Sequence, residues 1–135
     1  MNARNIIYWI PTALTAFLFL SGGAVDVARP GPALAGMTHL GYPPYFMIIL
    51  GVWKLLGGVV VLAPRTPLLK EWAYAGMLFD LTGASASHAS VGDPVAKVAT
   101  PLILLCIVIA SWALRPARRR VCDDTAGRIP KGRPD

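Results

Sequence analysis

The chain has 135 residues, of which 55% are hydrophobic and only 15% are charged, and its formal net charge is +6. A soluble domain of this size carries more charge and shows amphipathic stripes, so the composition argues against an ordinary globular fold. Nucleic-acid binding is the usual alternative for a basic chain. No basic stripe interleaved with aromatic residues supports it, and we expect no nucleic-acid partner.

Four apolar runs follow one another along the chain, at roughly residues 6–25, 45–63, 72–91 and 94–114. Each is close to the about 20 residues that a helix needs to cross a hydrocarbon core of about 30 Å. The sequence therefore predicts an all-α, multi-pass integral membrane protein with the lipid bilayer as its surroundings. We expect an antiparallel four-helix bundle over residues 1–114 and a basic, disordered cytoplasmic tail over residues 115–135.

The segments between the runs contain residues that end or start helices. Residues 26–44 are dense in proline and glycine, so we expect an outer loop that folds back as a cap over the bundle. Asp26 is expected at the outer interface, where it and His39 join the outer mouth of the bundle. Asp93 is predicted to cap the fourth helix, with Pro94 as its first residue.

Basic residues are unevenly distributed about the predicted spans. Of the 13 Lys and Arg residues, only Arg29 and Lys97 fall on one side and Lys54 lies within a span, which leaves ten for the other side. That other side carries the N-terminus, the turn at residues 63–71 and the C-terminus. Because basic loops stay in the cytoplasm, both termini are predicted to be cytoplasmic.

Two charged residues lie inside neighbouring apolar runs, at equal distances from the turn that joins them. Lys54 lies ten residues before Pro64, and Asp80 lies ten residues after Lys70. Antiparallel helices therefore place both charges at the same depth. A lone charge near the bilayer centre costs at least about 2.5–3.5 kcal/mol, so each needs a partner. The sequence predicts an intramembrane ion pair between them.

Polar residues continue from Asp80 toward the outer face. His88 lies two helical turns further along the same side of the third span, with Ser87 beside it. We predict a polar track in which Lys54, Asp80, Ser87 and His88 bind a ligand or relay protons. The alternative is an architectural ion pair that only determines which helices are neighbours.

Small residues surround both charges, and small residues let helices approach closely in lipid. We therefore predict structural packing contacts at five glycines, namely Gly51, Gly57, Gly58, Gly76 and Gly83.

Metal and catalytic sites find little support in the sequence. The only histidines are His39 and His88, and no helix carries a pair of ligands at a metal-binding spacing. We therefore expect neither a metal site nor haem. Nucleophilic triads and phosphate-binding loops are not recognisable, so no catalytic residue is assigned and the protein is not expected to be an enzyme on its own.

Several short strings together carry a family resemblance: YWI at residues 8–10, LGYP at residues 40–43, LGVWKLLG at residues 50–57, LKEWAYAG at residues 69–76, and FDLTGA at residues 79–84 followed by Ser87 and His88. Together they resemble the DoxX-like family of small four-helix bacterial membrane proteins, over nearly the whole chain up to about Arg120. The resemblance implies the bacterial cytoplasmic (inner) membrane. One departure is that many relatives carry a lysine near the end of the first helix, where this chain continues from Ser21 to Asp26 without one.

The resemblance also implies a class of function. The family name comes from a membrane subunit linked to thiosulfate oxidation with quinone as acceptor, and other members are associated with oxidative-stress protein complexes. We therefore expect an accessory membrane subunit of a redox system, with redox partner proteins, that binds a quinone or a similar small lipophile at Lys54 and Asp80. The alternatives are a proton-coupled small-molecule carrier and a structural membrane scaffold.

Overall fold

The computed structural model describes residues 3–116, and five helices make up most of this range. Their bounds are α1 (Ala3–Ala28), α2 (Gly31–His39), α3 (Pro44–Leu62), α4 (Pro67–Ser90) and α5 (Val95–Ala113). The predicted all-α class is confirmed for these residues. Most of the predicted tail, residues 117–135, lies outside the described range.

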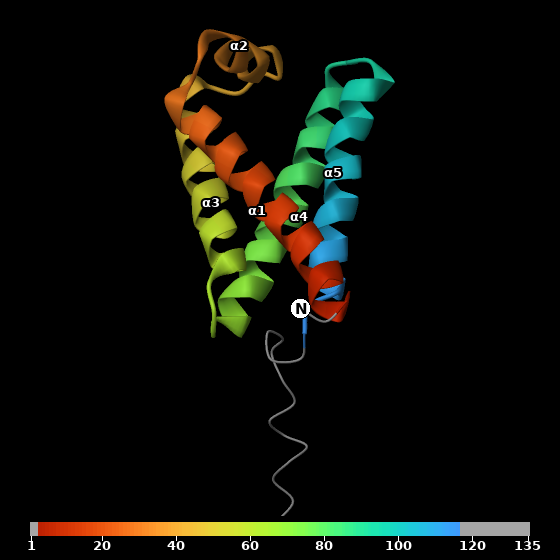
Figure 1. The fold of residues 1–135 in the computed structure, drawn as a ribbon. Helices are drawn as coiled ribbons and strands as arrows, with labels where there is room; N and C mark the ends of the chain where they lie inside the picture. Colours follow the sequence, from red (N-terminus) through yellow and green to blue (C-terminus); the bar gives the residue numbers. More distant parts are fainter. Residues whose placement is uncertain (1–2, 117–135) are drawn as a thin grey trace, which may run out of the picture.

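The four long helices form two pairs. α1 packs along α3, and α4 packs along α5, while contacts of α1 with α5 and of α3 with α4 join the pairs. Figure 1 shows the pairs meeting at the lower end, which holds the start of α1, the α3–α4 turn and the end of α5. They diverge toward the upper end, where α2 and the α4–α5 turn lie. These two ends are called the lower and upper ends below.

Three of the helices are long and apolar enough to cross a membrane, over Ile6–Ala28, Pro44–Leu62 and Val95–Ala113. The protein is therefore a membrane protein with a lipid environment. α4 contains the predicted third span but also carries Lys70, Glu71 and Asp80, and it is not among these three. The fourth spanning helix and the cytoplasmic termini thus stay predictions.

Three helices of this chain have proline at or near their first residue, and one of them, α2, lies in the segment predicted to be a loop. The predicted loop at residues 26–44 contains α2, with Pro32 in its first turn, where a missing N–H has no partner to lose. α3 and α4 also begin on prolines, Pro44 and Pro67. α4 starts five residues before the predicted span, because apolar content predicted the span whereas Pro67 determines the helix start. α5 begins at Val95, and Pro94 precedes it in an extended conformation.

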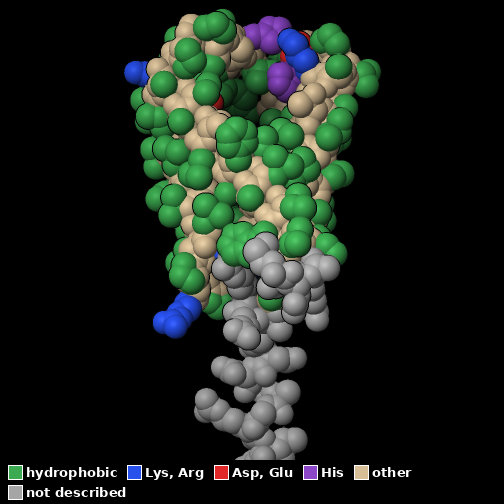
Figure 2. Space-filling model, in the orientation of Figure 1, with side chains coloured by type: hydrophobic (Ala, Val, Ile, Leu, Met, Phe, Trp, Pro, Cys, Tyr) green, Lys and Arg blue, Asp and Glu red, His purple; other side chains and the backbone are tan. Residues whose placement is uncertain are grey.

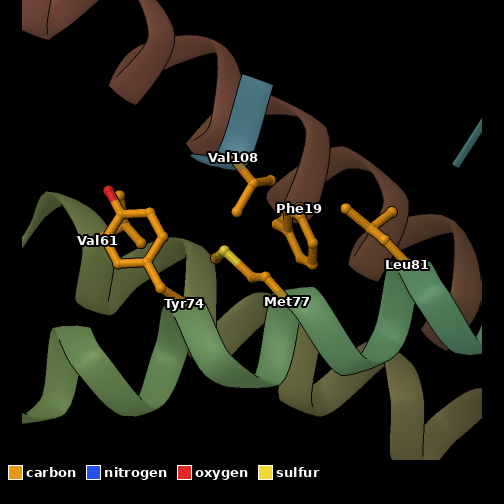
Figure 3. Packing of buried hydrophobic residues seen from close by; sticks show 6 residues of the cluster. All are labelled: Phe19, Val61, Tyr74, Met77, Leu81 and Val108. Carbon is orange, nitrogen blue, oxygen red and sulfur yellow. The ribbon is translucent and has the colours of Figure 1, made fainter. Parts of the chain in front are cut away.

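The hydrophobic core lies where the two pairs of helices converge. Figure 3 shows its members, which come from α1, α3, α4 and α5 and are Phe19, Val61, Tyr74, Met77, Leu81 and Val108. Each has at most 7% of its surface exposed. This shared core holds α4 against the three apolar helices and so positions the residues of its upper half.

Two basic residues at the lower end are buried rather than spread on a surface. Lys70 is 1% exposed, and its Nζ donates hydrogen bonds to the carbonyl oxygens of Val60, at 2.9 Å, and Val61 at the end of α3. Arg115, predicted to begin the tail, is 3% exposed and donates from Nη2 to Glu71 Oε1 at 2.6 Å. Both residues therefore belong to the folded helical unit, because α3 and α4 supply acceptors for them.

Candidate functional site

Lys54 lies between two carboxylates that come from different helices. Its Nζ donates a hydrogen bond to Asp26 Oδ2 at 2.8 Å and lies 3.7 Å from Asp80 Oδ2. Asp26 belongs to the last turn of α1 and Asp80 to the upper half of α4. These two carboxylates and Lys54 are called the charged triad below, and together they join α1, α3 and α4. The side chains of Lys54, Asp26 and Asp80 are 23%, 13% and 18% exposed.

Asp26 is the partner that the sequence reasoning missed. It was expected at the outer interface, away from Lys54, yet it makes the shorter of the two contacts. The reason is a close approach of backbones: a Cβ on Gly51 would lie 2.8 Å from Gly23 O and 2.9 Å from Asp26 Cβ. Small residues on both helices could have indicated this contact, because they allow such an approach in lipid.

The predicted packing glycines differ in what surrounds them. Gly51 and Gly58 both lie at tight contacts with α1, and a Cβ on Gly58 would lie 2.8 Å from Leu20 Cγ. Gly57 has a looser neighbour, the Met77 methyl group at 3.3 Å. Gly76 and Gly83 have no such neighbour within 4 Å, so the structure does not place them at close helix contacts. The tight interface is between α1 and α3, and α4 contributes open positions instead.

A groove between α3 and α4 runs from the charged triad toward the lower end. It encloses about 480 Å³, and the only charged residues in its lining are Lys54 and Asp80. The rest of the lining is apolar, with Trp53, Trp72 and Phe79 among its most exposed members. The groove therefore combines a charged end with an aromatic and aliphatic wall.

Asp80 differs from Asp26 in its hydrogen bonding. Its Oδ2 is too far from Lys54 Nζ for a hydrogen bond, and no other side-chain donor within the described residues bonds its carboxylate. The triad also contains two carboxylates for a single ammonium group. Among the described residues, Asp80 is consequently the carboxylate of this site that accepts no side-chain hydrogen bond within bonding distance.

Ser87 and His88 lie outside this groove and make other contacts. Ser87 Oγ lies 2.8 Å from Tyr42 Oη, and His88 Nδ1 lies 2.7 Å from Asp93 Oδ2. The structure thus divides the four predicted site residues between two places. Lys54 and Asp80 line the groove, whereas Ser87 and His88 belong to the upper end.

Asp93 organises the contacts at the upper end. Its carboxylate accepts hydrogen bonds from His88, from His39 Nε2 at 3.1 Å and from Lys97 Nζ at 3.2 Å, and it is 7% exposed. The prediction that Asp93 caps the fourth helix is wrong, because no side chain caps α5 and this carboxylate is engaged by three basic side chains instead. Figure 2 shows histidine side chains beside a hollow at this end. His39, His88, Asp93 and Lys97 are called the upper cluster.

The upper cluster lowers the pKa of Asp93. Its pKa is lowered from the ordinary 3.8 to about 2, mainly by the hydrogen bond from His88, against an opposing effect of burial and with further lowering by His39 and Lys97. A lowered pKa in the folded state means that the ionised carboxylate stabilises the fold. This stabilisation is complete above pH 3.8 and is lost as the pH falls through about 2.

Replacing Asp93 with asparagine is therefore expected to lower the stability of the protein at neutral pH. The difference in apparent Tm between the wild type and Asp93→Asn should shrink as the pH falls from 3.8 to about 2, because the wild-type carboxylate then becomes neutral too. Thermal unfolding in detergent, followed by circular dichroism at several pH values, measures this difference. A difference that stays constant over that interval would contradict the assignment.

The model of the DoxX-like family matches residues 10–111, which include the charged triad, the groove and the upper cluster. Comparisons with curated proteins and with solved structures found no match.

Proposed function

The chain belongs to the DoxX-like family, and from this we propose that it is a membrane subunit that binds a small lipophile in the groove between α3 and α4. The headgroup of the ligand would lie at Lys54 and Asp80, and its apolar part would lie along the wall below them. The expected setting is the bacterial inner membrane, with four spans and both termini in the cytoplasm. Redox proteins would be its partners, and a quinone is the ligand that the family suggests.

The observation that carries this proposal is the composition of the groove. Its volume of about 480 Å³ is in the range of about 300–1,000 Å³ that small-molecule sites occupy. Its lining places two charged side chains at one end of an otherwise apolar wall. Such a wall suits the ring and tail of a lipophile, and the charged end suits a headgroup that forms hydrogen bonds.

The proton-coupled carrier gains less support from the same geometry. That alternative needs a continuous polar track from Asp80 to the outer face. Within the described residues, no side-chain hydrogen bond links Asp80 to Ser87 or His88. A structural scaffold remains the competing reading, and it predicts that the groove binds no ligand.

Filling the groove provides the test. Gly76 lines it, and a Cβ added there meets no neighbouring atom within 4 Å, so we expect the side chain of Gly76→Leu to extend into the groove without disturbing the fold. We expect a short-chain quinone to bind Gly76→Leu at least about tenfold more weakly than the wild type, a loss of about 1.4 kcal/mol. Quenching of tryptophan fluorescence in nanodiscs measures this, because Trp53 and Trp72 line the groove.

Gly83→Leu is the matched control. It makes the same change on the same helix, also at a position where an added Cβ meets no atom within 4 Å, but Gly83 does not line the groove. Its quinone affinity should equal that of the wild type. If the wild type binds neither the quinone nor its hydroquinone, or if both variants bind equally well, the groove is not the binding site and the structural reading is favoured.

A further inference from the structure

The hydrogen-bonding state of the charged triad restricts the headgroup that the groove can accept. Lys54 already donates to Asp26 at 2.8 Å, whereas Asp80 Oδ2 lies 3.7 Å from the same ammonium group, without a hydrogen bond. Among the described residues, the only side chain recorded as an ion-pair partner of Asp80 is this ammonium group at 3.7 Å, and a mostly buried carboxylate with so few donors is costly in a membrane. The group that this site still needs is therefore a hydrogen-bond donor placed at Asp80.

The charges of the triad disfavour an anionic headgroup. Such a group would add a third negative charge beside Asp26 and Asp80, which already outnumber Lys54. A cationic headgroup at Asp80 would be attracted by both carboxylates and repelled only by the single ammonium group, which lies 3.7 Å from Asp80 Oδ2. The headgroups of quinones and hydroquinones are neutral, so they differ at this site through the hydrogen bonds that they can make.

Neutral headgroups differ in whether they can donate a hydrogen bond to Asp80. A quinone carbonyl only accepts hydrogen bonds, so it can use the remaining N–H groups of Lys54 but leaves Asp80 without a donor. A hydroxyl group on an aromatic ring can donate to Asp80 and also accept from Lys54. The hydrogen bond to an ionised carboxylate is about twice as strong as one between neutral groups.

We propose that the groove selects lipophiles whose neutral headgroup donates a hydrogen bond to Asp80, so that it binds a hydroquinone in preference to the corresponding quinone. This inference rests on the proposed function and specifies the ligand class of the same site. It makes Asp80 the specificity-determining residue, with Asp26 holding Lys54 in place. The exposed side chains of Trp53, Trp72 and Phe79 line the groove, and aromatic rings there suit contact with the ring of a ligand.

The preference has a redox consequence. Reduction of a quinone to a hydroquinone takes up two electrons and two protons, and tighter binding of the reduced form favours that direction. A tenfold preference corresponds to a rise of about 30 mV in the midpoint potential of the bound two-electron couple. An external electron donor and the solvent would supply the electrons and protons, so the groove itself only shifts the equilibrium.

The test compares matched ligands on the full-length protein in nanodiscs under anaerobic conditions. The probes are decylhydroquinone, its dimethyl ether and decylbenzoquinone, and calorimetry gives their dissociation constants. We expect the hydroquinone to bind at least about tenfold more tightly than the other two, as one charge-assisted hydrogen bond would produce. Equal binding of the three probes, or tighter binding of the quinone, overturns the inference.

Two variants assign the preference to a residue. In Asp80→Asn the charge is lost and an amide donor is gained, so the preference for the hydroquinone should fall to about twofold or less. Asp93→Asn makes the same change outside the groove and should keep the full preference. A preference that survives in Asp80→Asn overturns the role of Asp80, and the wild-type probe series decides the case if that variant does not fold.

The outcomes separate this inference from the proposed function. If none of the three probes binds to the wild type, the groove does not take such lipophiles and the proposed function itself is wrong. If the quinone and the hydroquinone bind with equal affinity, the groove is a binding site, but its selection for a donor is refuted.

Discussion

Replacing Lys54 with methionine is expected to lower the free energy of unfolding by about 3–5 kcal/mol, the usual cost of removing one partner from a buried ion pair. The variant leaves Asp26 and Asp80 facing the same space without the ammonium group that lies 2.8 Å and 3.7 Å from them. Both carboxylates are mostly shielded from solvent, so water compensates them only in part. Unfolding in detergent, followed by circular dichroism against denaturant concentration, measures the loss.

Rescue of the Lys54→Met variant shows whether the triad acts as a unit. Sequence reasoning alone would pair Lys54 with Asp80 and expect a double replacement to restore stability. Because Asp26 is the closer partner, the double variant that combines Lys54→Met with Asp80→Asn should recover only part of the lost stability. The triple variant that adds Asp26→Asn should recover most of the loss. Full recovery in the double variant would show that Asp26 contributes nothing to the triad.

Replacing Gly51 with alanine is expected to destabilise the protein by about 1–3 kcal/mol, as overpacking of a tight contact does. The added methyl group would lie 2.8 Å from Gly23 O, a backbone atom that cannot rotate away, and 2.9 Å from Asp26 Cβ. α1 and α3 must separate to admit it. The same denaturation assay measures the change.

Gly76→Ala is the matched control for this glycine, and it should not destabilise the protein. A methyl group at Gly76 meets nothing within 4 Å, and alanine favours a helix over glycine by about 1 kcal/mol. The control should therefore be neutral or slightly stabilising. If Gly51→Ala behaves in the same way as Gly76→Ala, the close approach of α1 and α3 does not exist in the protein.

The Lys54→Met and Gly51→Ala variants test connected features of the site. The contact between Gly23 and Gly51 is what brings the end of α1, and with it Asp26, to Lys54. Moving α1 away from α3 would lengthen the 2.8 Å contact and free Lys54 for Asp80. We therefore expect Gly51→Ala to weaken the preference for hydroquinone even where the protein still folds, because Asp80 would then share its charge with Lys54.

The sequence by itself determined the features that depend on local composition and spacing. Apolar runs predicted membrane helices because the length needed to cross a bilayer is a property of one segment. Equal spacing from one turn predicted that Lys54 and Asp80 lie near each other, because the helices on both sides of a short turn are neighbours. A set of short strings along the chain indicated the family that the comparison then showed.

Only the tertiary structure decided which distant residues complete each site. Asp26 reaches Lys54 across 28 positions, and His39 reaches Asp93 across 54. Neither contact follows from the spacing within one helix, because each depends on how a helix is rotated and how closely it approaches its neighbour. Those two quantities are determined by side chains and glycines on both helices together. For this reason Gly76 and Gly83 resembled packing residues in the sequence, yet open space surrounds them in the fold.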